Sequence, residues 1–188
     1  MNKKMTIREI AGFCPEEAVW KMMADVSGSL LQETQGCVLT PDSIVIDGKM
    51  FLVESGHDVL NEFMAPEDNG ESLPNVAQMV WTLGSLGYYT ATGRIIFGGH
   101  GGCYQKEHPF VALPVLSKDL QALNSVLQKC LCYLPDSRIS IEELNQLSLK
   151  GLAACEKQQR RKSAQPANET SIEVKHTGEK WPEEMIEI

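Results

Sequence analysis

The chain has 188 residues, of which 43% are hydrophobic, and this is enough for one domain with a substantial core. Its formal net charge of −8 argues against nucleic acid or an anionic membrane as the main partner, because both attract basic surfaces. No apolar run is long enough to span a bilayer, and the basic N-terminus leads into Ile7–Ile10 and not into an apolar signal core. We therefore expect a cytoplasmic protein.

The first part of the chain predicts two helices. Thr6 and Glu9 have the spacing of a capping box for a short helix that ends near Gly12. Pro15 suits the first turn of a second helix. Apolar residues then recur at helical spacing, namely Val19, Met22, Met23, Val26, Leu30 and Leu31.

The middle of the chain predicts one β-element and one buried helix. β-Branched and other apolar residues flank the pair Asp47-Gly48, which favours a two-residue hairpin over about 44–53. An extended loop rich in Asp, Asn, Gly and Pro follows over 57–74. Residues 74–92 are apolar on so many sides that we expect a core helix there.

The last part predicts a connection, two further helices and a tail. Gly98–Gly102 lacks the Lys-Ser/Thr pair and following helix of a phosphate-binding loop, so we interpret it as a flexible connection. Ser117 can cap one helix, and Ser140 opens the last helix, which runs to about Lys157. We expect one domain over 1–156 and a polar, disordered tail over 157–188, whose end at Trp181–Ile188 is a possible binding segment.

The cysteines and histidines do not predict a metal site. The six cysteines form no C-x-x-C pair, and in a protein without a signal peptide we expect reduced thiols. The alternative is a metal site whose candidate ligands are His100, Cys103 and His108, which are close in sequence. They lack an acidic or further cysteine ligand at fixed spacing, so we expect no metal and no cofactor.

Several short motifs stand in the order in which protein kinases carry them. Gly36–Ser43 occupies the place of the catalytic loop, Glu54-Ser55-Gly56 that of Asp-Phe-Gly, and Ala65-Pro66-Glu67 that of Ala-Pro-Glu. Val80–Gly84 resembles the Asp-x-Trp-Ser-Leu-Gly signature of the central kinase helix. Leu134–Ser140 resembles the Asp-Pro-x-x-Arg turn before the final helix.

Over about residues 5–155 the chain therefore resembles the C-terminal lobe of the protein kinase-like fold, which implies a mainly α structure with a small β-hairpin. Glu16–Trp20 and Leu30–Glu33 also resemble the KIND domain, a kinase C-lobe without the nucleotide lobe that binds proteins non-catalytically. The resemblance implies a mostly buried ion pair between Glu67 and Arg138, because kinases pair the corresponding side chains.

The same resemblance implies that catalysis has been lost. Val38 stands in place of the catalytic Asp and cannot accept a proton, and Ser43 replaces the magnesium-binding Asn. Glu54 replaces the Asp of Asp-Phe-Gly, and Met79 replaces the Asp that anchors the catalytic loop. Only about 35 residues precede the catalytic-loop equivalent, without a Gly-rich loop or strand-borne Lys. We expect no catalytic residues.

These observations favour a catalytically inactive, kinase-like module that acts in protein–protein interaction or scaffolding. Removal of the nucleotide lobe leaves a surface that a protein partner would cover. The alternative is one component of a nucleotide-binding or kinase enzyme that a separate chain completes. A helical domain whose likeness to kinases is coincidental is the third hypothesis.

Overall fold

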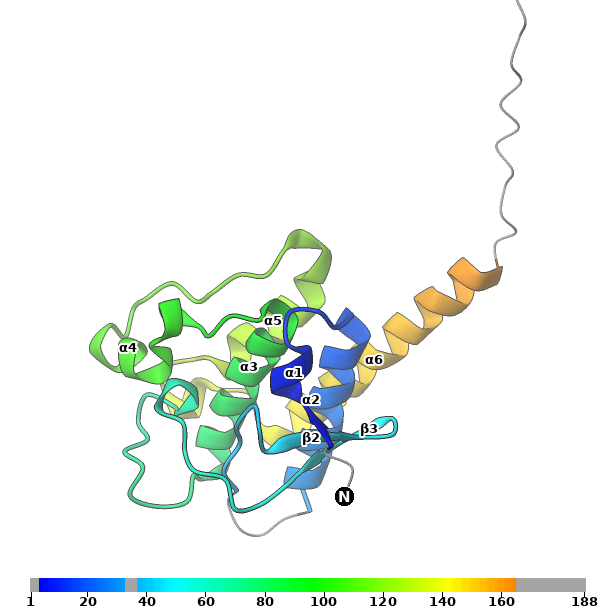
Figure 1. Ribbon diagram of the computed structural model, residues 1–188. Helices are drawn as coiled ribbons and strands as arrows, with labels where there is room; N and C mark the ends of the chain where they lie inside the picture. Colours follow the sequence, from blue (N-terminus) through cyan, green and yellow to red (C-terminus); the bar gives the residue numbers. More distant parts are fainter. Residues whose placement is uncertain (1–3, 33–36, 165–188) are drawn as a thin grey trace, which may run out of the picture.

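The helix α2 (Glu16–Leu30) is the centre of the packing in the computed structural model, which describes residues 4–32 and 37–164 (Figure 1). It packs against α6 (Ile141–Ala164), α3 (Val76–Thr92) and the small sheet. The chain is mainly helical with a small antiparallel sheet, as its sequence predicts. Among the described residues, no helix combines the length and apolar character needed to cross a bilayer.

The sheet contains the expected hairpin and one further strand. β1 (Met5–Thr6), β2 (Ile44–Asp47) and β3 (Met50–Val53) are antiparallel and stand in the order β1-β2-β3. Asp47 pairs with Met50, so the turn residues are Gly48 and Lys49, one position later than the sequence suggested. The shift has a physical reason, because a φ of 61° at the first turn position favours glycine.

A carboxylate of α2 holds the outer strand of the sheet. Asp25 accepts a hydrogen bond from the backbone N–H of Phe51 in β3 (3.0 Å) and forms an ion pair with Lys21 (2.6 Å). An edge strand with unpaired N–H groups is a template for pairing with another chain. Asp25 therefore joins β3 to α2 and closes this part of the edge.

The expected core helix is α3, and small residues bring it close to α5 (Gln121–Cys130). Asn75 and Gln78 form its capping box, and Gly93 ends it with a φ of 69°. At Gly84 a Cβ atom would lie 2.5 Å from the Cβ of Cys130, so glycine is what permits this approach. The two tryptophans expected in the core, Trp20 and Trp81, are both buried.

Shorter elements connect these helices. α1 (Ile7–Ile10) is the expected first helix, and the backbone N–H of Thr6 donates to Glu9 (2.9 Å). Ser117 makes no capping hydrogen bond, and a 3-10 turn leads from it into α5. The single-turn 3-10 helices are η1 (Asn61–Phe63), η2 (Phe97–Gly99), η3 (Lys118–Leu120) and η4 (Pro135–Ser137).

The glycine-rich segment is more ordered than a simple connection. It contains η2 and the first turn of α4 (Gly101–Glu107), a helix that the sequence analysis did not expect. A Cβ atom at Gly101 or Gly102 would lie 2.0–2.1 Å from the carbonyl oxygens of Glu62 and Met64. These glycines are therefore accounted for by close backbone packing against the loop after the hairpin.

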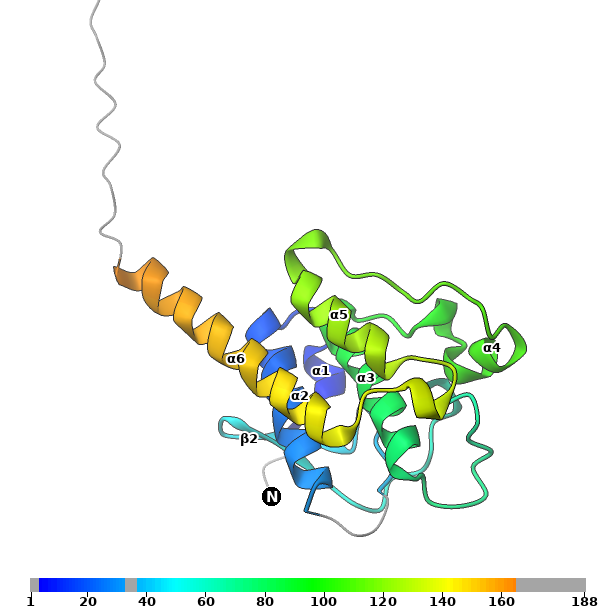
Figure 2. The same ribbon diagram turned by 180° about the vertical axis from the view of Figure 1, so that it is seen from behind.

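The last helix is longer than expected. The Oγ of Ser140 accepts from the N–H of Glu143 (3.2 Å), which fits the predicted capping box, but α6 continues past Lys157 to Ala164 (Figure 2). Its final turns extend beyond the body of the protein. Residues 165–188, which include the possible binding segment Trp181–Ile188, lie outside the described residues, so the expected tail stays a prediction.

Where α6 crosses α2, the close packing predicts that position 151 requires glycine. A Cβ atom at Gly151 would lie 2.4 Å from the ring of the buried Trp20. Overpacking costs about 1–3 kcal/mol, and the roughly 1 kcal/mol gained in helix propensity offsets only part of it. We expect Gly151→Ala to lower the free energy of unfolding in urea titrations.

Gly28→Ala is the matched control, because Gly28 is also helical and its Cβ would lie 3.4 Å from the Asn145 side chain, an ordinary contact. It should leave stability unchanged or raise it by up to about 1 kcal/mol. Equal effects of the two substitutions would contradict the packing described for Gly151.

Candidate functional site

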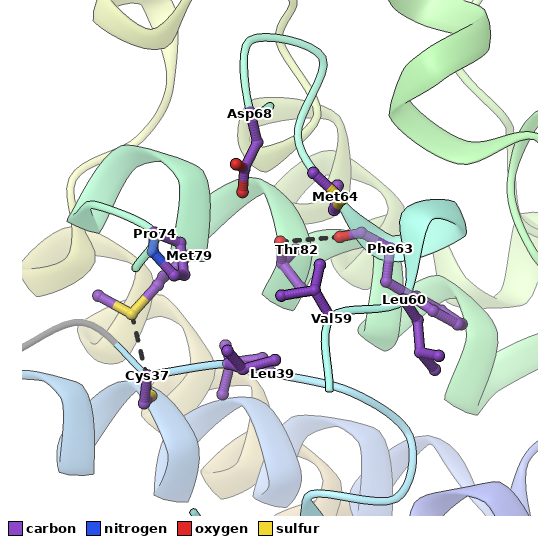
Figure 3. A pocket seen from close by; sticks show the side chains of 11 residues that line it. Cys37, Leu39, Val59, Leu60, Phe63, Met64, Asp68, Pro74, Met79 and Thr82 are labelled. Carbon is purple, nitrogen blue, oxygen red and sulfur yellow. Dashed lines mark hydrogen bonds between the residues drawn. The ribbon is translucent and has the colours of Figure 1, made fainter. Parts of the chain in front are cut away.

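Two of the four residues that the sequence motifs align with kinase positions line one small cavity. Val38 and Met79 are both part of its wall. The wall is mainly apolar (Figure 3). The cavity measures about 20 Å³. That is room for about one water-sized group, so no nucleotide fits there. The remaining lining residues are Cys37, Leu39, Val59, Leu60, Phe63, Met64, Asp68, Pro74 and Thr82.

The contacts around the cavity join α3 to the segments before and after the hairpin. The Sγ of Cys37 lies 3.9 Å from the Sδ of Met79, so Met79 contacts the residue next to Val38. The hydroxyl of Thr82 donates to the carbonyl oxygen of Phe63 (2.8 Å; Figure 3). The walls are thus fixed by one sulfur contact and one buried hydrogen bond.

The other two degenerate positions meet at the base of the hairpin. Ser43 is fully buried, and its hydroxyl accepts from the N–H of Thr40 (2.8 Å) and donates to the Thr40 carbonyl (3.2 Å). The N–H of Glu54 donates to the carbonyl of Ser43 (2.7 Å), and the Glu54 carboxylate pairs with Lys4 (3.2 Å). The side chains of Ser43 and Glu54 thus both have partners within the protein.

Asp68 is the one acid among the residues that line the cavity. Its carboxylate is turned toward the space between Met79 and Thr82 (Figure 3). It also accepts from the N–H of Gly70 (2.9 Å), which shapes the loop locally. The other residues of the wall are apolar except Cys37 and Thr82, and the Thr82 hydroxyl already donates to the carbonyl of Phe63.

The structure brings together Glu67 and Arg138, which are 71 residues apart in the sequence. Two N–H···O contacts of 2.6 and 2.7 Å make the pair bidentate. The Arg138 side chain is 1% exposed and the Glu67 side chain is 28% exposed. The pair is therefore buried on the arginine side and reaches solvent on the glutamate side.

Arg138 uses all its donors. Besides its two contacts to Glu67, it donates to the backbone carbonyls of Cys132 (2.8 Å), Ala77 (2.9 Å) and Tyr133 (2.9 Å). A guanidinium carries five N–H groups, and here each has an acceptor. This single side chain ties the loop after the hairpin, the first turn of α3 and the turn before α6.

The cavity opens on a surface that is both acidic and apolar. Val59, Leu73 and Val76 are exposed around it. Between Lys49 and Arg94 the sequence contains six acidic residues and no Lys or Arg. Asp58 and Glu71 are exposed and form no ion pair with any described residue. We refer to Val59, Leu73 and Val76 with Asp58 and Glu71 as the acidic–apolar surface.

The sequence analysis missed this surface. It treated residues 57–74 as a polar loop, although Leu73 is an isolated aliphatic residue in a polar stretch and the loop lacks any cation. These two features of the sequence could have indicated the acidic–apolar surface. Which aliphatic side chains stay exposed depends on how the loop packs, and that packing is non-local.

The two histidines of the cysteine and histidine cluster lie around an aromatic ring. His100 and His108 both lie against the ring of Tyr104, with centroid distances of 6.2 and 4.5 Å. In the part of the chain that the structure describes, no three His, Cys, Asp or Glu side chains are grouped to hold a metal ion. All six cysteines are free thiols, and burial raises the pKa of Cys130.

Arg138 should be among the most sensitive positions of the fold. Its removal takes a donor from the carbonyls of Cys132 and Tyr133 and the cation from Glu67, so Arg138→Ala should cost roughly 3–5 kcal/mol. Arg138→Lys should also destabilise, because an ammonium has three donors in place of five. Denaturant unfolding measures both. A cost below about 1 kcal/mol for Arg138→Ala would show that the network is not structural.

Comparison with known proteins adds no relative from which a function could be transferred. No protein-family model matches the chain, and no curated protein is significantly similar to it.

Proposed function

We propose that this protein is a catalytically inactive, kinase-like module, similar to a KIND domain, that binds another protein in the cytoplasm. The observation that carries the proposal is the apolar cavity lined by Val38 and Met79, where the motif order places catalytic groups. Exposed aliphatic residues surround a cavity too small for a nucleotide. Such a surface suits the side chains of a polypeptide better than phosphates.

The remaining kinase positions support the absence of phosphoryl transfer. That reaction needs held phosphates, held magnesium and an oriented hydroxyl. The hydroxyl of Ser43 is consumed by Thr40, and the carboxylate of Glu54 is paired with Lys4. Neither group is preorganised to coordinate magnesium together with another carboxylate.

The acidic–apolar surface indicates the chemistry of the partner. Three partly exposed aliphatic side chains contribute a few kcal/mol when a partner covers them. The unpaired carboxylates of Asp58 and Glu71 would attract cations and repel anions, which gives specificity and a faster association. We infer a partner segment that carries aliphatic anchors among Lys and Arg residues.

The first test concerns nucleotide. Calorimetric titration with ATP and magnesium should give no heat of binding at micromolar concentrations, and no autophosphorylation should occur. Micromolar affinity that Glu54→Ala abolishes would contradict the proposal. It would favour the alternative that this chain is one component of a nucleotide-binding enzyme completed by a second chain.

The second test concerns the partner. Random peptides displayed on phage should yield binders with Lys or Arg beside aliphatic residues when they are selected on the immobilised protein. Leu73→Lys should weaken the binding of such a peptide at least tenfold, because it removes an exposed anchor and places a cation against a cationic partner.

Leu149→Lys is the matched control, because Leu149 is 52% exposed on α6 and Leu73 is 60% exposed beside the cavity. It should leave peptide affinity unchanged. The affinity for the peptide should also fall with added salt, since unpaired surface charges are screened. Recovered peptides without net positive charge would refute the inferred partner chemistry.

A further inference from the structure

A second exposed apolar surface lies away from the cavity, in the connection between α4 and α5. Residues 109–116 are all apolar, with the sequence Pro-Phe-Val-Ala-Leu-Pro-Val-Leu. The segment runs along the outside of the molecule (Figure 2). Phe110 is 100% exposed, and Val115 and Leu134 are exposed as well. A fully exposed aromatic side chain in an uncharged segment is unusual for a surface that faces only water.

The segment is held in place at its far end. The N–H of Leu116 donates to the side chain of Asn124 (3.0 Å), and the Leu116 side chain is buried. Before it, the buried Gln105 accepts from the indole N–H of Trp81 (2.9 Å) and donates to the carbonyl of Leu131 (2.9 Å). Phe110 is therefore displayed between two fixed points.

An open cavity lies directly beside Phe110. It measures about 440 Å³, and its wall includes Val111, Leu113, Leu131 and Leu134. Gln105 is also part of the wall, but both ends of its amide already have partners. The cavity thus offers an apolar space with room for an aromatic ring. We call the surface formed by residues 109–116 and Leu134 the Phe110 face.

Charge decides which occupant suits this face. The protein carries a formal net charge of −8, so two copies repel each other over most of their surface. Residues 109–117 contain no charged side chain. Lys106 and Glu107 stand before the segment and Lys118 and Asp119 after it, so each end carries one cation and one anion. Two copies related by a two-fold axis can therefore meet over a segment that has no charge of its own.

We propose that the Phe110 face is the contact between two copies of this chain in an isologous dimer. In a two-fold contact the same patch serves both copies, so a projection and a hollow must lie on one surface. Phe110 and the neighbouring cavity meet that condition. Phe110 of each copy inserts into the cavity of the other. The contact is separate from the acidic–apolar surface and does not depend on the proposed function.

The size of the face sets the expected strength. Stable complexes bury about 800 Å² per partner with about 20–30 residues on each side. The Phe110 face has fewer residues than that, so we expect a reversible dimer with a dissociation constant in the micromolar range. Added salt should not weaken it, because the contact is apolar and screening reduces the repulsion between the two acidic copies.

Analytical ultracentrifugation of the full chain tests the proposal, at concentrations from about 1 to 300 µM. The wild type should shift from monomer to dimer over this range. Phe110→Glu should raise the dissociation constant at least tenfold, since the substitution places a carboxylate in an apolar cavity. Phe13→Glu is the matched control, because Phe13 is 91% exposed on another part of the surface, and it should dimerise like the wild type.

A full chain that remains monomeric throughout this range contradicts the proposal. If a chain that ends at Ala164 then dimerises, residues 165–188 cover the face in the intact protein, and the dimer is likewise refuted for the full chain. Dimerisation that Phe110→Glu leaves unchanged, or that Phe13→Glu abolishes equally, assigns the contact to a different surface. Circular dichroism of both variants confirms that each is folded.

Discussion

The guanidinium of Arg138 is the interaction on which the arrangement of the site depends. Its five N–H groups meet Glu67 and the backbone carbonyls of Ala77, Cys132 and Tyr133, which belong to three segments of the chain. A buried guanidinium without acceptors would cost several kcal/mol of stability. The folded state is therefore favourable only when these segments lie together around Arg138. The loop after the hairpin is in this way attached to α3 and to the turn that precedes α6.

This attachment explains why a loop rich in acidic residues can present a defined surface. Two of the six acids between Lys49 and Arg94 are paired, Glu67 with Arg138 and Glu54 with Lys4. Asp58 and Glu71 are exposed to solvent. Close packing of Gly101 and Gly102 against Glu62 and Met64 fixes the neighbouring part of the same loop. The middle of the loop is therefore anchored, which lowers the ordering cost that a partner would meet on binding beside the cavity.

Local patterns in the sequence predict most of the helices, because capping residues and apolar spacing act within a few residues. The contact of Glu67 with Arg138 is also within reach of the sequence, since both residues stand in short motifs of a known order. The turn at Gly48 and the helix α4 were not predicted correctly. Their geometry depends on pairing with β2 and on backbone contacts with residues 62–64, which no local pattern contains.

The two exposed apolar surfaces could not be predicted for a related reason. Leu73 and Phe110 look alike in a sequence, because an aliphatic or aromatic residue in a loop usually packs inward. Only the fold shows that both point outward, one beside carboxylates and the other beside an uncharged cavity. The difference in charge between them is the reason why we propose a cationic partner for one and a second copy for the other.

Amide hydrogen exchange, measured with and without a cationic peptide selected on the protein, tests the central claim most directly. If the acidic–apolar surface binds the partner, the added peptide should slow exchange in residues 57–76 and leave residues 109–116 unchanged. Protection confined to another part of the chain, with residues 57–76 unaffected at a saturating peptide concentration, would contradict the assignment of the binding site.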